Sequence, residues 1–109
     1  MRVKNYLEVK ATQELPGVLK REVITAQDGA PNFKMRVFEV EPGGATPNHT
    51  HAWEHEVFVL AGEGMVVGEG GETPVAEGSV VFVAPDEPHC FINKGDEPLR
   101  FICLIPLPK

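Results

Sequence analysis

The chain of 109 residues has few cysteines, no long apolar run and a shortage of basic residues. Its two cysteines, Cys90 and Cys103, form no CxxC pair and are too few for a disulfide scaffold. No apolar run reaches the length of a membrane span. The N-terminus lacks the apolar stretch and cleavage site of an export signal. We therefore expect a cytoplasmic protein that does not cross a membrane.

The charge balance argues against nucleic acid as a partner. The 10 Lys and Arg residues face 16 Asp and Glu residues, which gives a formal net charge of −6. An acidic chain repels phosphate backbones. The length predicts a single domain over residues 1–109, large enough to bury one core without disulfides or other staples.

The apolar pattern is that of a β-protein. No stretch keeps a 3.6-residue apolar period over three turns. Instead, 11 glycines and 10 prolines punctuate short β-branched and aromatic runs, as in a sandwich or barrel. The expected strands cover residues 6–10, 18–25, 33–40, 46–51, 55–60, 63–68, 72–76, 79–84, 89–93 and 98–105.

Strand alternation predicts which side chains face the interior. If Lys34 and Arg36 point to solvent, then Phe33, Met35 and Val37 point inward. The same reasoning places Leu99, Phe101, Cys103 and Ile105 inside. The strand 55–60 is apolar on both faces, so it needs a second cover. Because a large apolar patch usually marks an interface, we expect a homodimer.

All four histidines fall in two short segments. HTHAWEH contributes His49, His51 and His55, and PDEPHCFIN contributes His89. Neutral imidazole is the commonest metal ligand among side chains. Histidines at i and i+2 on a strand share a face, so both rings can reach one ion at about 2.0–2.2 Å. The sequence therefore predicts a metal site, against the alternative of solvated or core histidines near a turn.

This spacing resembles the first motif of the cupins, G(x)5HxH(x)3–4E(x)6G. Its positions fall on Gly43, His49, His51, His55 and Gly62. The departure is that His55 stands where most cupins have glutamate. Glu56 offers a competing register, but it leaves five residues before Gly62 instead of six. Strand parity also puts Glu56 on the face opposite His55, so we favour His55 as the ligand.

The second cupin motif, G(x)5PxG(x)2H(x)3N, is matched at Gly78, His89 and Asn93. Ala84 and Asp86 replace its usual Pro and Gly. The two motifs cover residues 43–93, and the strand pattern extends the resemblance over most of the chain. The resemblance implies an all-β double-stranded β-helix, the jelly-roll cupin barrel. Within the family the chain looks like the small bacterial cupins that bind manganese through four histidines.

The resemblance and the donor set imply a divalent transition metal held by His49, His51, His55 and His89. Manganese is the expected ion, and iron, nickel, copper and zinc are the alternatives. The side chains expected to line the pocket are Met35, Trp53, Phe91, Phe101 and Cys103. Asn93 is expected to tie a turn.

We expect a metal-dependent oxygenase or lyase that acts on a small organic molecule such as an enol, a diketone or an alkene. No basic residue is expected inside the barrel, which places sugar phosphates, and hence a sugar isomerase-like cupin, behind these substrates. No general base is identified, so the catalytic residues remain open. Two further alternatives are a binding or sensing protein without turnover and a structural zinc site.

Overall fold

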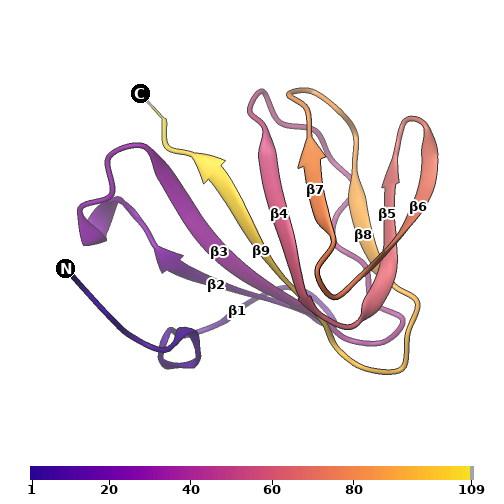
Figure 1. Ribbon diagram of the computed structural model, residues 1–109, viewed down its shortest axis with the longest axis horizontal. Coiled ribbons are helices and arrows are strands. Elements are labelled where there is room, and N and C mark those ends of the chain that lie inside the picture. Colours follow the sequence, from indigo (N-terminus) through magenta and orange to yellow (C-terminus); the bar gives the residue numbers. More distant parts are fainter. Residues whose placement is uncertain (109) are drawn as a thin grey trace.

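The computed structural model describes residues 1–108, which form two antiparallel β-sheets (Figure 1). The strand order is β1-β2-β3-β9-β4-β7 in the larger sheet and β6-β5-β8 in the smaller one. The expected all-β jelly-roll barrel is confirmed. The bounds are η1 Tyr6–Glu8, β1 Thr12–Leu15, β2 Val18–Ile24, η2 Ala26–Asp28, β3 Phe33–Val40, β4 His55–Ala61, β5 Glu63–Gly68, β6 Gly71–Ala76, β7 Val80–Val83, β8 Cys90–Asn93 and β9 Leu99–Pro106.

Two of the expected strands are wrong. Residues 6–10 begin with the 3-10 turn η1, because the Asn5 side chain accepts a hydrogen bond from the Leu7 N–H and caps it. Residues 46–51 form no strand and contribute only an isolated bridge, His49 to His89. Pro47 lacks the N–H that a continuous ladder needs there.

One strand is present that we did not expect. The polar strand β1 pairs with β2 across a Pro16-Gly17 turn in which Gly17 has φ 82°. This left-handed conformation suits glycine. The strand has no buried residue, so its sequence lacks the apolar alternation that would have predicted it.

The register of β3 against β9 corrects the predicted orientation of residues 33–37. Arg36 pairs with Cys103, and Phe38 pairs with the core residue Phe101. Arg36 therefore points into the barrel, and Met35 points outward. The predictions that Met35 faces the interior and lines its pocket are wrong. Charged side chains can point inward here because they find partners. Lys34, on the same inner face as Arg36, pairs with Glu22 at 2.7 Å.

Aromatic stacking joins the two sheets. The Phe101 ring of β9 lies 4.5 Å from the Phe91 ring of β8 and 5.2 Å from the Phe38 ring of β3, measured between ring centres. Phe101 is 1% exposed, and Leu99 and Val59 are fully buried beside it. As expected for β9, Leu99, Phe101 and Cys103 face the core. This packed layer forms the floor beneath the histidines.

Side-chain hydrogen bonds of Asn93 hold together the end of the barrel that is remote from the histidines. The Asn93 amide nitrogen donates 2.8 Å hydrogen bonds to the carbonyl oxygens of Val40 and Glu97. Its side-chain oxygen accepts from the Gly95 N–H at 2.8 Å. Asn93 is 2% exposed, so these bonds replace water completely. The prediction that it ties a turn is confirmed.

The outer face of β4 and β7 is apolar and exposed. Phe58, Val80 and Phe82 are 46%, 74% and 64% exposed. The expected homodimer stays a prediction, and this face is where we place it. Among residues 1–108, no helix has the length and apolarity needed to cross a bilayer.

The substitution Phe82→Asp tests the dimer. A carboxylate in a buried apolar interface loses its hydration, so we expect the variant to be monomeric where the wild type has the mass of two chains. Size-exclusion chromatography with light scattering measures this, and Thr73→Asp, at an exposed residue of β6 in the smaller sheet, is the control. A monomeric wild type, or a dimeric Phe82→Asp, contradicts the prediction.

Candidate metal centre

The four imidazole rings lie together at one end of the barrel. The ring-centre distances are 4.4 Å for His49–His51, 4.7 Å for His55–His89 and 5.1 Å for His51–His55. The distances from His89 to His49 and to His51 are 5.5 and 6.3 Å. Imidazoles that share one ion at about 2.1 Å have ring centres roughly 4.6–6.5 Å apart. All of these distances except the 4.4 Å between His49 and His51 fall within this range, so the rings lie close enough to share one ion after a small adjustment of that pair.

Backbone contacts bring the two histidine segments together. His49 and His89 exchange N–H to carbonyl hydrogen bonds of 3.4 and 3.3 Å. The Asp86 N–H donates to the His51 carbonyl oxygen at 2.6 Å. Asp86 has φ 66°, at the position where the family motif usually has glycine. Aspartate tolerates this left-handed conformation better than most residues, so the turn survives the replacement.

The hydrogen bonds of His89 and His55 leave one nitrogen of each ring free. His89 Nδ1 lies 3.0 Å from the Glu87 carbonyl oxygen, which can only accept, so Nδ1 carries the proton and Nε2 has a free lone pair. His55 Nδ1 lies 3.2 Å from Cys103 Sγ and 3.5 Å from Arg36 Nη2. Within residues 1–108, His55 Nε2 is buried without a hydrogen-bond partner. A buried nitrogen without a partner is costly, and a bound ion would satisfy it.

Burial favours the neutral form of three of the clustered rings, His49, His51 and His55. It lowers the pKa of His49 and of His51, and the repulsion that a proton on either ring would meet from the neighbouring imidazoles and from Arg36 adds to the effect. Burial lowers the pKa of His55 to about 3, again helped by His89 and Arg36. Metal ligation needs unprotonated imidazole. These three rings are therefore in the ligating form at neutral pH.

The donor atoms of the four rings do not converge on one point. Across residues 1–108, no group of three or more His, Cys, Asp or Glu side chains is already arranged to hold a metal ion. Because the ring centres lie close together, we expect the rings to turn onto an ion about their side-chain bonds. His49 is exposed and His51 half-buried, so both have room to turn. The four histidines therefore fit a metal ion if the rings of His49 and His51 turn toward it.

The structure separates the two rival ligands of the first motif. His55 is 5% exposed and faces the other rings. Glu56 is exposed and lies opposite Phe82 on the outer face. The strand parity predicted for these two residues is therefore observed, and the Glu56 register brings no carboxylate to the cluster.

The expected pocket residues occupy different places. Trp53 is 40% exposed, and its ring stacks on His51 at 4.6 Å between ring centres. Cys103 touches His55, whereas Phe91 and Phe101 belong to the packed core below. A groove of about 510 Å³ between the sheets is lined by His89 together with Val66, Val81 and Glu87. It gives a small molecule access to one side of the cluster.

A larger groove lies away from the histidines. It measures about 660 Å³ and separates the N-terminal segment from the outer sheet face at Val23, Met35 and Ile102. No histidine lines it, so it plays no part in the candidate site.

The residue that the sequence reasoning missed is Arg36. Its Nη2 donates to Cys103 Sγ at 3.1 Å, and its guanidinium carbon lies 5.0 Å from the centre of the Phe38 ring. A signal for it exists in the sequence. Counting the alternation back from the apolar Val40 and Phe38 puts Arg36 inside, whereas counting from the charged residues puts it outside.

Comparison with known proteins agrees with this architecture. The family described as "Cupin domain" matches residues 36–105. An oxalate-binding protein from Thermotoga maritima is 30% identical over 108 residues, which is 95% of this chain and 84% of that protein. A 1-methylthio-D-xylulose 5-phosphate methylsulfurylase from Rhodospirillum rubrum is 31% identical over 78% of this chain, which spans only 54% of that protein. The solved structure of the polyketide cyclase RemF from Streptomyces resistomycificus is 36% identical with a TM-score of 0.88. The match to this structure covers 97% of this chain and 79% of the cyclase chain.

Proposed function

The chain belongs to the cupin family, and from that premise we propose that it is a metal-dependent cupin acting on a small organic molecule. His49, His51, His55 and His89 would hold a divalent transition metal, with manganese as the expected ion. The observation that carries the proposal is the cluster of four imidazoles, in which the buried Nε2 of His55 has no hydrogen-bond partner among residues 1–108.

The chemistry of such a site is limited by its donors. When bound, the metal would supply Lewis-acid polarisation of a carbonyl or enol oxygen, or a site for dioxygen. The backbone carbonyl of Glu87 orients His89, and Cys103 Sγ contacts Nδ1 of His55. The stacked layer of Phe38, Phe91 and Phe101 keeps water from the inner side. The exposed His49 side and the groove beside His89 leave room for a ligand.

Arg36 changes which substrates the barrel favours. It adds a positive charge beside neutral imidazoles, so the field at the site favours an anionic or enolisable ligand. Polyketides carry enolisable ketones, and the similarity to a polyketide cyclase therefore supports the enol and diketone class. We propose this class as the substrate, in a lyase-type or oxygenase-type reaction.

Two other functions have an observation in their favour. The similarity to an oxalate-binding protein over 95% of the chain favours metal-dependent binding without turnover. The sequence argument against sugar phosphates was wrong, because Arg36 is a basic residue inside the barrel. The similarity to a methylsulfurylase of a sugar phosphate keeps that substrate class as the third candidate.

Metal analysis followed by turnover assays tests the proposal. Protein purified without an affinity tag or chelator is expected to carry near-stoichiometric manganese or another exchangeable first-row metal. Addition of enols and diketones should then give metal-dependent product or oxygen uptake, followed by mass spectrometry and an oxygen electrode. Tight ligand retention without product would favour the binding protein. A single non-exchanging zinc would favour a structural site and overturn the proposal.

A further inference from the structure

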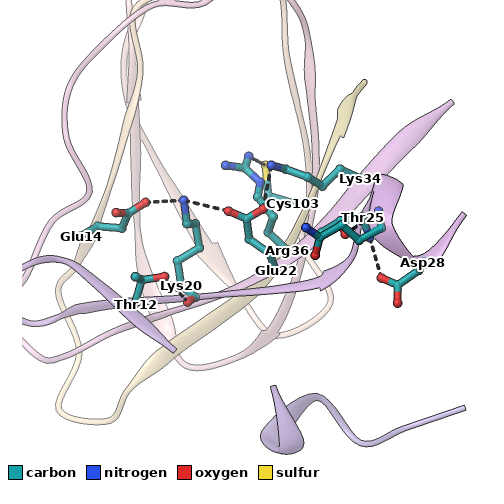
Figure 2. A network of polar contacts seen from close by, with 10 residues as sticks. Thr12, Glu14, Lys20, Glu22, Thr25, Asp28, Lys34, Arg36 and Cys103 are labelled. Atoms are coloured by element: carbon teal, nitrogen blue, oxygen red, sulfur yellow. Dashed lines mark hydrogen bonds and ion pairs between the residues drawn. The ribbon is translucent and has the colours of Figure 1, made fainter. Parts of the chain in front are cut away.

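Cys103 and Arg36 form a short chain of contacts that ends on His55. Arg36 Nη2 donates to Cys103 Sγ at 3.1 Å, as drawn in Figure 2. The same sulfur lies 3.2 Å from His55 Nδ1. Cys103 is 3% exposed and His55 is 5% exposed, so water does not compete for either contact. The sulfur is thus fixed between a guanidinium and an imidazole.

Strand pairing explains why these three side chains meet. Arg36 and Cys103 are directly opposite in the β3–β9 ladder, and Cys103 is opposite Val57 in the β9–β4 ladder. His55 precedes Val57 by two residues and therefore points to the same face of β4. The three side chains thus come from three adjacent strands, β3, β9 and β4, and strand pairing rather than a loop sets the geometry of their contacts.

The contacts of Arg36 differ from those of the neighbouring basic side chains. Lys34 and Lys20 on the same inner face are paired with Glu22 at 2.7 and 3.5 Å, and Lys20 also with Glu14 at 2.6 Å (Figure 2). Within residues 1–108, Arg36 has no carboxylate at ion-pair distance, and its Nε is buried without a partner. The guanidinium is therefore directed to the sulfur instead of to an acid.

The tautomer of His55 is the property that this chain of contacts can control. A guanidinium only donates hydrogen bonds, whereas a cysteine sulfur can accept them. The thiol can also donate its S–H to Nδ1, and Arg36 Nη2 lies 3.5 Å from the same nitrogen, at the outer limit of a hydrogen bond. The burial of Nε2 favours the form in which His55 donates its Nδ1–H to the sulfur, because a buried N–H without an acceptor is rarer in proteins than a lone pair without a donor. The Nε2 lone pair is then free for a metal ion bound among the imidazoles. In many metal sites a carboxylate or carbonyl accepts this second hydrogen bond from a ligand histidine.

We propose that Cys103 is a positioning residue that holds His55 as its Nδ1–H tautomer, with Arg36 fixing the sulfur. Its importance for metal binding rests on the proposed function. The tautomer itself does not, because it exists in the metal-free protein. The sulfur would act as the acceptor that a carboxylate supplies elsewhere, and it would orient the Nε2 lone pair toward the cluster.

The test compares imidazole tautomers in metal-free wild type and variants by ¹⁵N–¹H NMR of the ring nitrogens. In the wild type we expect His55 to carry its proton on Nδ1. Cys103→Val keeps a buried side chain of similar size but removes the acceptor, so the Nε2–H form should appear. Cys103→Ser retains an acceptor and should retain the Nδ1–H form. Cys90→Val, at the other buried cysteine, is the matched control and should change nothing.

Mn²⁺ titration of the same proteins gives the second readout. Loss of an outer hydrogen-bond partner of a ligand histidine weakens metal binding by about 10- to 100-fold, which we expect for Cys103→Val but not for Cys90→Val. A wild-type His55 protonated on Nε2, or an unchanged tautomer in Cys103→Val, overturns the inference. If the wild type binds no metal, the proposed function fails, and the NMR comparison still decides the role of Cys103. If Cys103→Val does not fold, the wild-type tautomer and Cys103→Ser decide it.

Discussion

Replacing His55 with alanine should lower the affinity for Mn²⁺ by more than about 100-fold, because a ligand matters more than an outer partner, whose loss costs about 10- to 100-fold. His55 is buried at the start of β4, its ring lies beside those of His51 and His89, and its Nε2 has no hydrogen-bond partner among residues 1–108. Isothermal titration of metal-free protein with Mn²⁺ measures the effect.

The matched control is Glu56→Ala. Glu56 is the next residue on the strand and the rival ligand by sequence, but it lies exposed on the opposite face. Its replacement should leave the Mn²⁺ affinity unchanged. Wild-type affinity in His55→Ala together with weakened binding in Glu56→Ala would transfer the ligand role to the carboxylate and contradict the account.

Replacing Phe101 with alanine should lower the free energy of unfolding by about 3–5 kcal/mol, the range for removal of a buried phenylalanine. Phe101 is 1% exposed and stacks on both Phe38 and Phe91, so its loss opens a cavity between the two sheets. Urea denaturation followed by circular dichroism measures the change.

Phe33→Ala is the control for the core. Phe33 lies on β3, next to β9, but is 59% exposed, and exposed substitutions usually change stability by no more than about 0.5 kcal/mol. If both variants lost the same stability, the stacked layer between the sheets would not be the main core. A destabilised Phe101→Ala beside a stable Phe33→Ala supports it.

Much of the candidate site could be predicted from the sequence because it is encoded locally. His49, His51 and His55 fall within seven residues, and alternation alone places His55 and Glu56 on opposite faces. Turn residues and β-branched runs marked most strands. His89 was indicated by the spacing of the second motif, from Gly78 through His89 to Asn93. In the structure a backbone bridge to His49 brings this segment to the other histidines.

The errors arose where long-range pairing decides. The face on which Arg36 lies depends on its register with Cys103, a residue 67 positions away in the chain. A local rule that charged residues face solvent gave the opposite answer and misplaced Met35. The inner face can hold charge because Lys34 finds Glu22 across the β2–β3 pair, a compensation invisible to local patterns. Strand β1 was missed for a related reason, since it pairs at the sheet edge without burying a residue.

The most direct test of the central claim is an anomalous difference map from crystals grown with Mn²⁺. The account predicts one strong manganese peak among the four imidazoles, with Nε2 of His55 and of His89 directed at it. The His49 and His51 rings should have turned without a shift of the backbone. A peak on other residues, or manganese-treated crystals without a peak at the cluster, would contradict the four-histidine site and the function proposed from it.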